Sequence, residues 1–238
     1  RLGSGVHGTR QYIESTMPQR RDTSWSGRLG AAFARPWPNR CAVCHSPTRG
    51  LGRRQRADCT DRYAAPRPRC LRCALAVPQG VALCGHCLRE PPPWSRAVAA
   101  CDYGHPWDGV LADFKFRAAL DLAPALADLL VHALGPEPPA VDLLLPVPLA
   151  PARLRERGYN QAALLAAALG RQRPIAVRTD VLLRIADTPH QVALPRERRI
   201  ANLRGAFAVE PLTLQAVRGR RIALLDDVMT TGATLAEA

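Results

Sequence analysis

The stretch Ile222-Ala223-Leu224-Leu225-Asp226-Asp227-Val228-Met229-Thr230-Thr231-Gly232-Ala233-Thr234 decides the fold class. Its four apolar residues predict a buried β-strand over 222–225, which ends in two adjacent carboxylates. A turn rich in threonine and glycine follows, and it opens a helix that we expect to begin at Thr231. A strand, a tight turn and a helix in this order are typical of an α/β protein with a parallel sheet.

Further elements of the same kind lie upstream. Apolar runs predict strands over 97–101 and 141–147, and the spacing of apolar residues predicts helices over 110–116, 122–134 and 160–169. Gly135-Pro136 should end the second of these helices, while Asn160 should cap the third and Gly170 should stop it. This alternation predicts an α/β fold in which helices cover a mostly parallel sheet.

The turn after the strand at 222–225 carries the groups that a phosphorylated sugar needs. Its backbone N–H groups, at the positive end of a helix, would cradle a phosphate, and Gly232 permits a close approach. Asp226 and Asp227 should instead accept hydrogen bonds from neutral hydroxyls or hold a metal ion. These groups predict a ribose 5-phosphate site made of Asp226, Asp227, Thr230, Thr231, Gly232, Ala233 and Thr234. The alternative is that Asp227 only caps the helix and the threonines pack locally.

Seven of the eight cysteines lie between residues 41 and 90, and six of them form Cys-x-x-Cys pairs. Both thiolates of such a pair can reach one metal ion from a tight turn, and two pairs complete a tetrahedral Zn²⁺ site. The spacing of Cys70, Cys73, Cys84 and Cys87 therefore predicts a structural zinc site. Disulfides are the weaker alternative because nothing in the sequence directs export, and three pairs in arginine- and proline-rich loops do not resemble a redox dithiol.

A second zinc site is incomplete in the sequence. Three thiolates come from Cys41, Cys44 and Cys59, and Arg62 occupies the position three residues after Cys59, where a fourth pair would close. Either His45 or Asp61 could supply the missing ligand. Alternatively, the pairs could be interleaved between the two sites, or the second site could be vestigial.

The net charge is +13, and the basic excess is unevenly distributed. Residues 1–96 hold 17 arginines against five acidic residues, whereas the rest of the chain is close to neutral. A basic segment favours a polyanionic partner such as nucleic acid, although from charge alone we favour a solubilising surface. The chain has no run of 18 apolar residues, and its first 30 residues lack the apolar core of a signal peptide, so we expect a cytoplasmic protein without membrane insertion.

These observations predict three parts. Residues 1–40, which are rich in Arg, Gly, Ser and Pro, are expected to be disordered or a non-native extension. Residues 41–93 are expected to form a zinc-ribbon module that ends at the stiff Pro91-Pro92-Pro93 spacer, and residues 94–238 the α/β domain. Because the chain ends inside a predicted helix, where a parallel sheet would continue, we expect this domain to be C-terminally truncated.

The stretch at 222–234 resembles the phosphoribosyl pyrophosphate (PRPP) motif of type I phosphoribosyltransferases. Other segments resemble the competence protein F (ComF) family, and they occur in the family's order over about residues 41 to 238. These segments are the N-terminal double zinc ribbon, Leu144-Leu145-Pro146-Val147-Pro148, the run from Arg153 to Gln161, Thr188-Pro189-His190-Gln191, Arg199, Asn202 and Arg204-Gly205-Ala206-Phe207.

The resemblance implies a type I phosphoribosyltransferase-like parallel sheet with flanking helices, preceded by a small zinc-ribbon domain. Asp226 and Asp227 would contact the ribose hydroxyls of PRPP, residues 230–234 would hold its 5-phosphate, and Mg²⁺ would accompany it. The pyrophosphate loop would fall near residues 146–157. There Arg153 and Arg157 are spaced to present two guanidinium groups to one polyanion, or they form a solvated helix face. The segment 187–204 would be a mobile loop that closes over the ligand.

Two functions follow from the resemblance. The first is a phosphoribosyltransferase, a pentosyl-transferring glycosyltransferase of nucleoside metabolism, in which an acceptor displaces pyrophosphate from PRPP; the sequence identifies neither a general base nor the acceptor. The second is a role in DNA uptake, in which the zinc module binds single-stranded DNA or a DNA-uptake protein and the PRPP site senses a ligand without catalysis. The module offers few aromatic residues for base stacking, which counts against DNA binding. The zinc module could also be purely structural or dock a protein partner.

Overall fold

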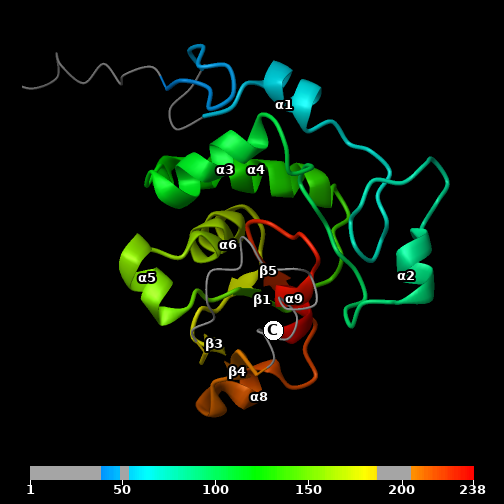
Figure 1. Ribbon diagram of the computed structural model, residues 1–238, viewed down its shortest axis with the longest axis vertical. Coiled ribbons are helices and arrows are strands. Elements are labelled where there is room, and N and C mark those ends of the chain that lie inside the picture. The colour runs from blue at the N-terminus through cyan, green and yellow to red at the C-terminus, as the bar shows by residue number, and fades with distance from the viewer. Residues whose placement is uncertain (1–38, 49–53, 187–204) are drawn as a thin grey trace, which may run out of the picture. The chain divides into compact units, whose positions relative to one another are not determined.

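The computed structural model describes residues 39–48, 54–186 and 205–238. The described residues belong to one compact unit, and the predicted N-terminal extension lies outside them except for Asn39 and Arg40. The described part contains short helices, a parallel sheet and an antiparallel pair of strands (Figure 1). Within it, no helix is long and apolar enough to cross a bilayer. The predicted boundary after Pro93, between a zinc-ribbon module and an α/β domain, stays a prediction.

The elements follow one another in a simple order. The cysteine-rich part holds α1 (Ala57–Tyr63) and α2 (Gly85–Arg89). The helices α3 (Trp107–Phe116) and α4 (Ala123–Leu134) come next, with a 3₁₀ turn over Leu120–Leu122 between them. They precede β1 (Leu143–Pro146), α5 (Pro151–Arg157), α6 (Gln161–Gln172), β2 (Ala176–Val177) and β3 (Leu182–Arg184). The last elements are β4 (Phe207–Val209), a 3₁₀ turn over Pro211–Thr213, α8 (Leu214–Val217), β5 (Ile222–Leu225) and α9 (Ala233–Glu237).

The sheet has three parallel strands in the order β2-β1-β5, which confirms the predicted mixed α/β architecture with a parallel sheet. All four residues of β1 are buried, as expected for a central strand with both faces covered. Leu144 faces the cluster that α3, α4 and α6 form, whereas Leu143 and Leu145 pack with Val181 and Leu182. Figure 1 accordingly shows these helices on one side of β1 and β5, and β3, β4 and α8 on the other.

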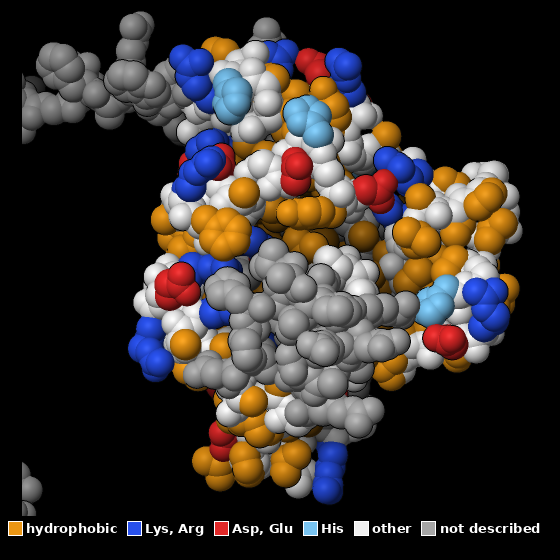
Figure 2. All heavy atoms as spheres, in the orientation of Figure 1, with side chains coloured by type: hydrophobic (Ala, Val, Ile, Leu, Met, Phe, Trp, Pro, Cys, Tyr) orange, Lys and Arg blue, Asp and Glu red, His pale blue; other side chains and the backbone are white. Residues whose placement is uncertain are grey.

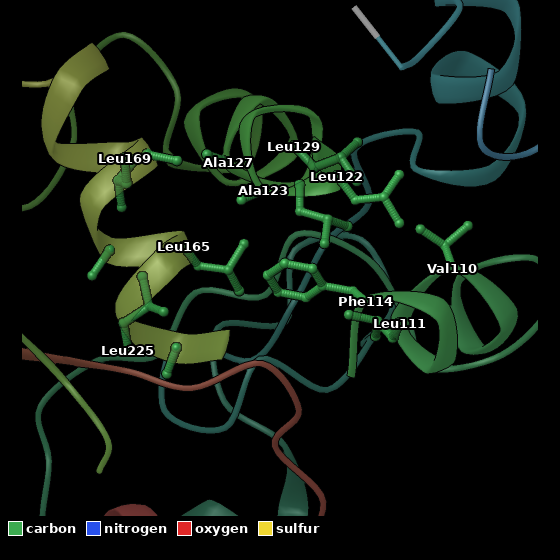
Figure 3. Close-up of a cluster of buried hydrophobic side chains, with 14 of the residues drawn as sticks. Val110, Leu111, Phe114, Leu122, Ala123, Ala127, Leu129, Leu165, Leu169 and Leu225 are labelled. Carbon is green, nitrogen blue, oxygen red and sulfur yellow. The ribbon is translucent and has the colours of Figure 1, made fainter. Parts of the chain in front are cut away.

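The main core lies between the helices and the sheet. Phe114 of α3 is fully buried, and Figure 3 shows its ring pointing toward Leu165 of α6, close to Leu122 and Ala123. Burying an aromatic or leucine side chain of this kind contributes about 1.5–3 kcal/mol. Since Leu144 of β1 and Leu225 of β5 belong to the same cluster, this core holds α3 in a fixed position relative to the ends of the two strands.

The structure confirms most predicted elements and corrects several of them. The helix over 122–134 is α4 and ends at Gly135, and Asn160 caps α6 through hydrogen bonds from Ala162 and Ala163. Gly170 does not stop α6, which continues to Gln172. A Cβ on Gly170 would lie 2.6 Å from Val177 Cγ2, so glycine is needed there for the close approach of β2.

Two other expectations were wrong. Residues 97–101 are not a strand, because none of them pairs with a described strand; Cys101 there is partly buried against the core. The last helix begins at Ala233 and not at Thr231, because Gly232 adopts a left-handed conformation that ends the preceding turn. The antiparallel pair β3–β4 was not predicted.

Candidate functional site

The carboxyl ends of β1 and β5 lie side by side. The two strands are parallel, with Pro146 opposite Leu225, and the Val147 N–H donates to the Leu225 carbonyl over 2.9 Å. The chain therefore leaves the sheet at the same edge in both places. In open parallel sheets, ligands bind at this edge. The segments 147–157 and 226–234, which lie far apart in the sequence, begin next to each other here.

Asp226 and Asp227 follow β5 directly. The Asp226 Oδ1 accepts a hydrogen bond from the Asp227 backbone N–H over 2.8 Å. Burial, and then the negative charge of Asp227, raises the pKa of Asp226 to about 7. This carboxyl therefore gains and loses its proton near neutral pH, and it can either accept or donate a hydrogen bond.

Lys115, in the last turn of α3, carries a charge that the sequence analysis missed. Its Nζ lies 3.0 Å from Asp227 Oδ2, and the side chain of Asp227 is only 5% exposed. The buried Oδ2 accepts no hydrogen bond of good geometry from the described residues, so the contact is an ion pair held by charge. One signal was available: Lys115 is the only lysine among 33 basic residues.

The end of α3 also contacts the segment after β1. The Tyr159 hydroxyl donates to the Phe114 carbonyl, and the guanidinium of Arg157 lies 5.1 Å from the centre of the Phe116 ring. With Lys115 on Asp227, three consecutive residues of α3 connect the two segments that leave the sheet. Helix α3 therefore fixes the spacing between these segments, although it belongs to neither.

The predicted pair of arginines is not equivalent in the structure. Arg157 donates to Gln161 Oε1 and covers Phe116, so its guanidinium is already engaged. Among the described residues, no hydrogen bond or ion pair engages the side chain of Arg153. The two arginines therefore differ, since only the guanidinium of Arg157 is engaged by described residues.

The threonine- and glycine-rich turn reaches α9 through Gly232. Gly232 has φ +75°, and a Cβ placed on it would lie 2.7 Å from the Trp94 ring. The Thr231 hydroxyl accepts a hydrogen bond from the Ala233 N–H at 3.4 Å, while Thr230 is exposed. Glycine is therefore required at position 232 both by the backbone conformation and by the contact with Trp94.

Trp94 connects this turn to the cysteine-rich part. Its indole N–H donates to the Arg72 carbonyl, and the Arg72 guanidinium donates back to the Trp94 carbonyl over 3.1 Å. Arg72 stands between Cys70 and Cys73. The position of Trp94 against Gly232 thus depends on the backbone that presents these two cysteines.

The four cysteines Cys70, Cys73, Cys84 and Cys87 come together as the spacing predicts. Their sulfur atoms lie within 4.8 Å of one another. The Cys73 and Cys84 sulfurs are 3.7 Å apart, and the Cys84 N–H donates to Cys70 Sγ over 3.3 Å. Four converging thiols without a carboxylate suit Zn²⁺ in a closed tetrahedral site. The donor set therefore fits structural zinc.

Cys41, Cys44 and Cys59 form a separate cluster, with sulfur atoms within 4.8 Å of one another, so the pairs are not interleaved. Among the described residues, neither His45 nor Asp61 joins this cluster, and both are exposed. Arg62 lies over the Tyr63 ring, 5.3 Å from its centre. This cluster also has the chemistry for a metal ion, but with three ligands.

Several residues that carry the family resemblance lie outside the described part of the chain. They are Thr188, Pro189, His190, Gln191, Arg199, Asn202 and Arg204, all within the segment 187–204 for which a mobile loop was expected. Gly205 and Phe207 are described, and Phe207 begins β4.

Known proteins similar to this chain were found among curated sequences. A DNA utilization protein YhgH of Shigella flexneri is 34% identical over 204 residues, which cover 83% of this chain and 81% of that protein. A protein of the same name from Escherichia coli (strain K12) matches to the same extent. A competence protein F of Haemophilus influenzae is 34% identical over 175 residues, 71% of this chain and 76% of that protein.

No protein-family model and no solved structure matches the chain. The curated relatives nevertheless cover most of the chain at about one-third identity, and they include competence protein F itself. We conclude that the chain belongs to the competence protein F (ComF) family.

Proposed function

We propose that the chain binds the ribose 5-phosphate part of PRPP at the shared edge of β1 and β5, as a phosphoribosyltransferase-like protein. The observation that carries the proposal is the position of Asp226 and Asp227 between Lys115 and the turn around Gly232, beside the segment that follows β1. This arrangement offers carboxylates for hydroxyls and backbone N–H groups for a phosphate at one edge of a parallel sheet.

The carboxylates would hold the two ribose hydroxyls. Asp227, paired with Lys115, stays an acceptor. Because the pKa of Asp226 is raised to about 7, this carboxyl is an ionised acceptor for a ribose hydroxyl only above that pH. Lys115 also offsets negative charge that would otherwise repel a polyphosphate ligand. We therefore assign Lys115 the role of a positioning residue, which acts through Asp227.

The turn over residues 230–234 would bind the 5-phosphate. Gly232 holds the turn in a left-handed conformation against Trp94, and the exposed hydroxyls of Thr230 and Thr231 supply donors. Arg153, which lies in α5 after β1, would approach the pyrophosphate. Mg²⁺ would arrive with the polyphosphate and neutralise its charge, since the described residues at this edge hold no set of three metal ligands.

If the site is catalytic, an acceptor forms a bond to the anomeric carbon while the bond to pyrophosphate breaks. The groups present favour this substitution by orientation and by charge compensation at the leaving group. The acceptor is not identified by the residues at the site. The relatives are named for DNA utilization and for competence, and we propose that such an activity, or ligand sensing by the same site, serves that role in this chain.

Calorimetric titration with PRPP and Mg²⁺ tests the proposal. The wild-type protein should bind, and the double variant Asp226→Asn/Asp227→Asn should lose binding by at least about 100-fold, since two ligand contacts to buried groups disappear. Asp142→Asn is the matched control, because Asp142 lies at the opposite end of the same two strands, where it binds Arg221. Equal binding by the wild type and the double variant would refute the site.

The pH dependence tests the role of Lys115. Wild-type affinity should fall as the pH drops through about 7, where Asp226 gains a proton. Removal of the cation in Lys115→Met raises the pKa of Asp226 further, so the same loss should occur at higher pH, and Lys115→Arg should restore the profile.

In the ligand-free protein, the raised pKa of Asp226 means that its contribution to stability is present below pH 4 and is lost as pH rises to about 7. Asp226→Asn should remove that decline.

Binding of single-stranded DNA by the cysteine-rich part is the second candidate function, and the relatives named for DNA utilization favour it. The described surface argues against it in part. Leu71, Leu75 and Leu88 are 45%, 63% and 67% exposed, and Figure 2 shows hydrophobic side chains gathered over the region of α2. DNA binding would have to weaken steeply with salt and disappear when zinc is removed.

A further inference from the structure

The two cysteine clusters stand on the same backbone pattern, repeated 29 residues later. Arg40 pairs with Pro47 in an antiparallel bridge around the first Cys-x-x-Cys, and Arg69 pairs with Ala76 around the second. The guanidinium of each arginine also caps the turn inside its bridge, Arg40 on the carbonyl of His45 and Arg69 on that of Ala74. We name residues 40–60 the first knuckle and residues 69–88 the second knuckle; the first is described except for residues 49–53.

The turns of the two knuckles match residue by residue. The N–H of Cys41 donates to Ser46 over 2.9 Å, and that of Cys70 donates to Leu75 over 2.8 Å. His45 has φ +57° and Ala74, at the corresponding position, has φ +59°. His45 is therefore the left-handed turn residue of its knuckle, and among the described residues it is not part of the cysteine cluster.

The helical halves of the knuckles also match, now 28 residues apart. Cys59 is the third residue of α1 and Cys87 is the third residue of α2, and both are buried. The residue that caps α1 is Arg56, with φ −103° and ψ 142°, whereas Cys84, with φ −73° and ψ 158°, caps α2. The carbonyl of each cap accepts from the residue four positions later over 3.1 Å, Thr60 in α1 and Leu88 in α2.

From this correspondence we infer that the two knuckles are copies of one metal-binding unit, and that Arg56 occupies the position of the fourth thiolate in the first. Cys59 then corresponds to Cys87, and the residue that would complete its pair lies three positions before it. The sequence had pointed to Arg62, three positions after Cys59. Arg62 lies further along α1, over the Tyr63 ring, and has no counterpart among the ligands of the second knuckle.

The substitution leaves the first knuckle with a different kind of metal site. Three thiolates hold Zn²⁺ with one coordination position left over, which water or a small exogenous ligand fills, whereas the second knuckle is closed by four thiolates. The guanidinium of Arg56 turns to Asp58, at 3.0 Å, and cannot itself bind a metal. The chain therefore carries one closed structural site and one open three-thiolate site.

Titration of the full chain with Co²⁺ tests this inference, because thiolate-to-cobalt absorption reports how many sulfurs bind each ion. The wild type should bind one ion tightly with four sulfurs and a second ion more weakly with three. Arg56→Cys should give two four-sulfur sites and raise the affinity of the weaker site by about 100-fold or more, a larger change than the 10–100-fold typical of groups outside the metal's own ligands. Arg62→Cys is the matched control and should leave both sites as in the wild type.

The reciprocal variant Cys84→Arg protects the test against a folding defect in Arg56→Cys. It should convert the second knuckle to a three-sulfur site and leave the first unchanged. The inference is overturned if Arg62→Cys, and not Arg56→Cys, completes the weaker site. It is also overturned if the wild type shows two equal four-sulfur sites, or if the first knuckle binds no metal in either the wild type or Arg56→Cys.

Discussion

The two knuckles share their turns, their caps and their buried cysteines, yet they differ in one ligand and in what they contact. In the second knuckle, Cys84 supplies both the helix cap and a sulfur. In the first, Arg56 keeps the cap geometry without the sulfur. The backbone of the unit is therefore maintained by its own hydrogen bonds even where the metal-binding set is reduced. The comparison shows that the knuckle fold and its metal chemistry can be separated.

The two knuckles also differ in the parts of the molecule to which they are connected. The first is fastened to the helical core: Arg54 pairs with Asp121, and the indole N–H of Trp107 donates to the Tyr63 carbonyl over 2.8 Å. The second is fastened through Trp94 to the turn around Gly232. The knuckle with four thiols is thus connected through Trp94 to the proposed phosphate turn, whereas the knuckle with three thiols is connected, directly and through α1, to the turn before α4 and to α3.

Loss of one cysteine should separate the knuckles most strongly. With one equivalent of zinc, the wild type should load the second knuckle, so Cys87→Ser should lose bound zinc with an affinity drop of more than about 100-fold. Cys59→Ser should retain that zinc, because it alters only the open site. Metal content after gel filtration measures the effect. Equal zinc loss in the two variants would mean that the knuckles do not differ in affinity.

The next largest effect is expected on stability, when the contact between Trp94 and Gly232 is disturbed. Gly232→Ala combines a positive φ with a Cβ only 2.7 Å from the Trp94 ring, so the free energy of unfolding should fall by about 2–4 kcal/mol. Gly219→Ala is the matched control, with φ +67° and open space around the Cβ, and should cost about 1 kcal/mol. Urea unfolding measures both.

A second substitution shows how much of the stability loss in Gly232→Ala comes from the contact with Trp94, which connects the turn to the second knuckle. In a Trp94→Ala background, Gly232→Ala should cost no more than Gly219→Ala, because the ring that it meets is gone. An unchanged cost in that background would show that Trp94 does not press on the turn, and the second knuckle would lose its connection to the proposed site.

The sequence predicted those parts of the molecule that depend on local pattern. The strand at 222–225 and the helix cap at Asn160 follow from apolar runs and from one capping side chain, and the structure has both; β5 is less buried than expected, because Ile222 is 36% exposed and only Leu225 is buried. The four-thiol cluster followed from its spacing. Each of these features is specified within a few residues of the chain.

Features that depend on contacts between distant residues could not be predicted. Lys115 lies 112 positions from Asp227, and only the packing of α3 on the core brings its amine to the carboxylate. Arg56 was missed for a related reason. The pair spacing of two residues is symmetric, so the sequence could not decide on which side of Cys59 the missing ligand lies; the start of α1 decides it.

The two buried or half-buried tryptophans allow a finer comparison. Trp107 is only 2% exposed, and Trp107→Phe leaves the Tyr63 carbonyl without its donor, so the free energy of unfolding should fall by about 1–2 kcal/mol. Trp94→Phe removes a similar bond from a half-buried position, where water can replace it, and should cost less than about 1 kcal/mol. A larger cost for Trp94→Phe would mean that the second knuckle, and not the first, anchors the fold.

Metal removal gives a spectroscopic readout of the same contact between Trp94 and the second knuckle. Chelation releases the turn that holds the Arg72 carbonyl, so the indole of Trp94 becomes more exposed and its fluorescence should shift to longer wavelength. The shift should disappear in Trp94→Phe and persist in Trp107→Phe, because Trp107 is held by the core and by α1. A shift that instead depends on Trp107 would place the metal-sensitive contact at the first knuckle. The same chelation should weaken PRPP binding only if the metal-sensitive contact is the one between Trp94 and Gly232. The fluorescence shift and the PRPP affinity can therefore be measured and compared in a single sample.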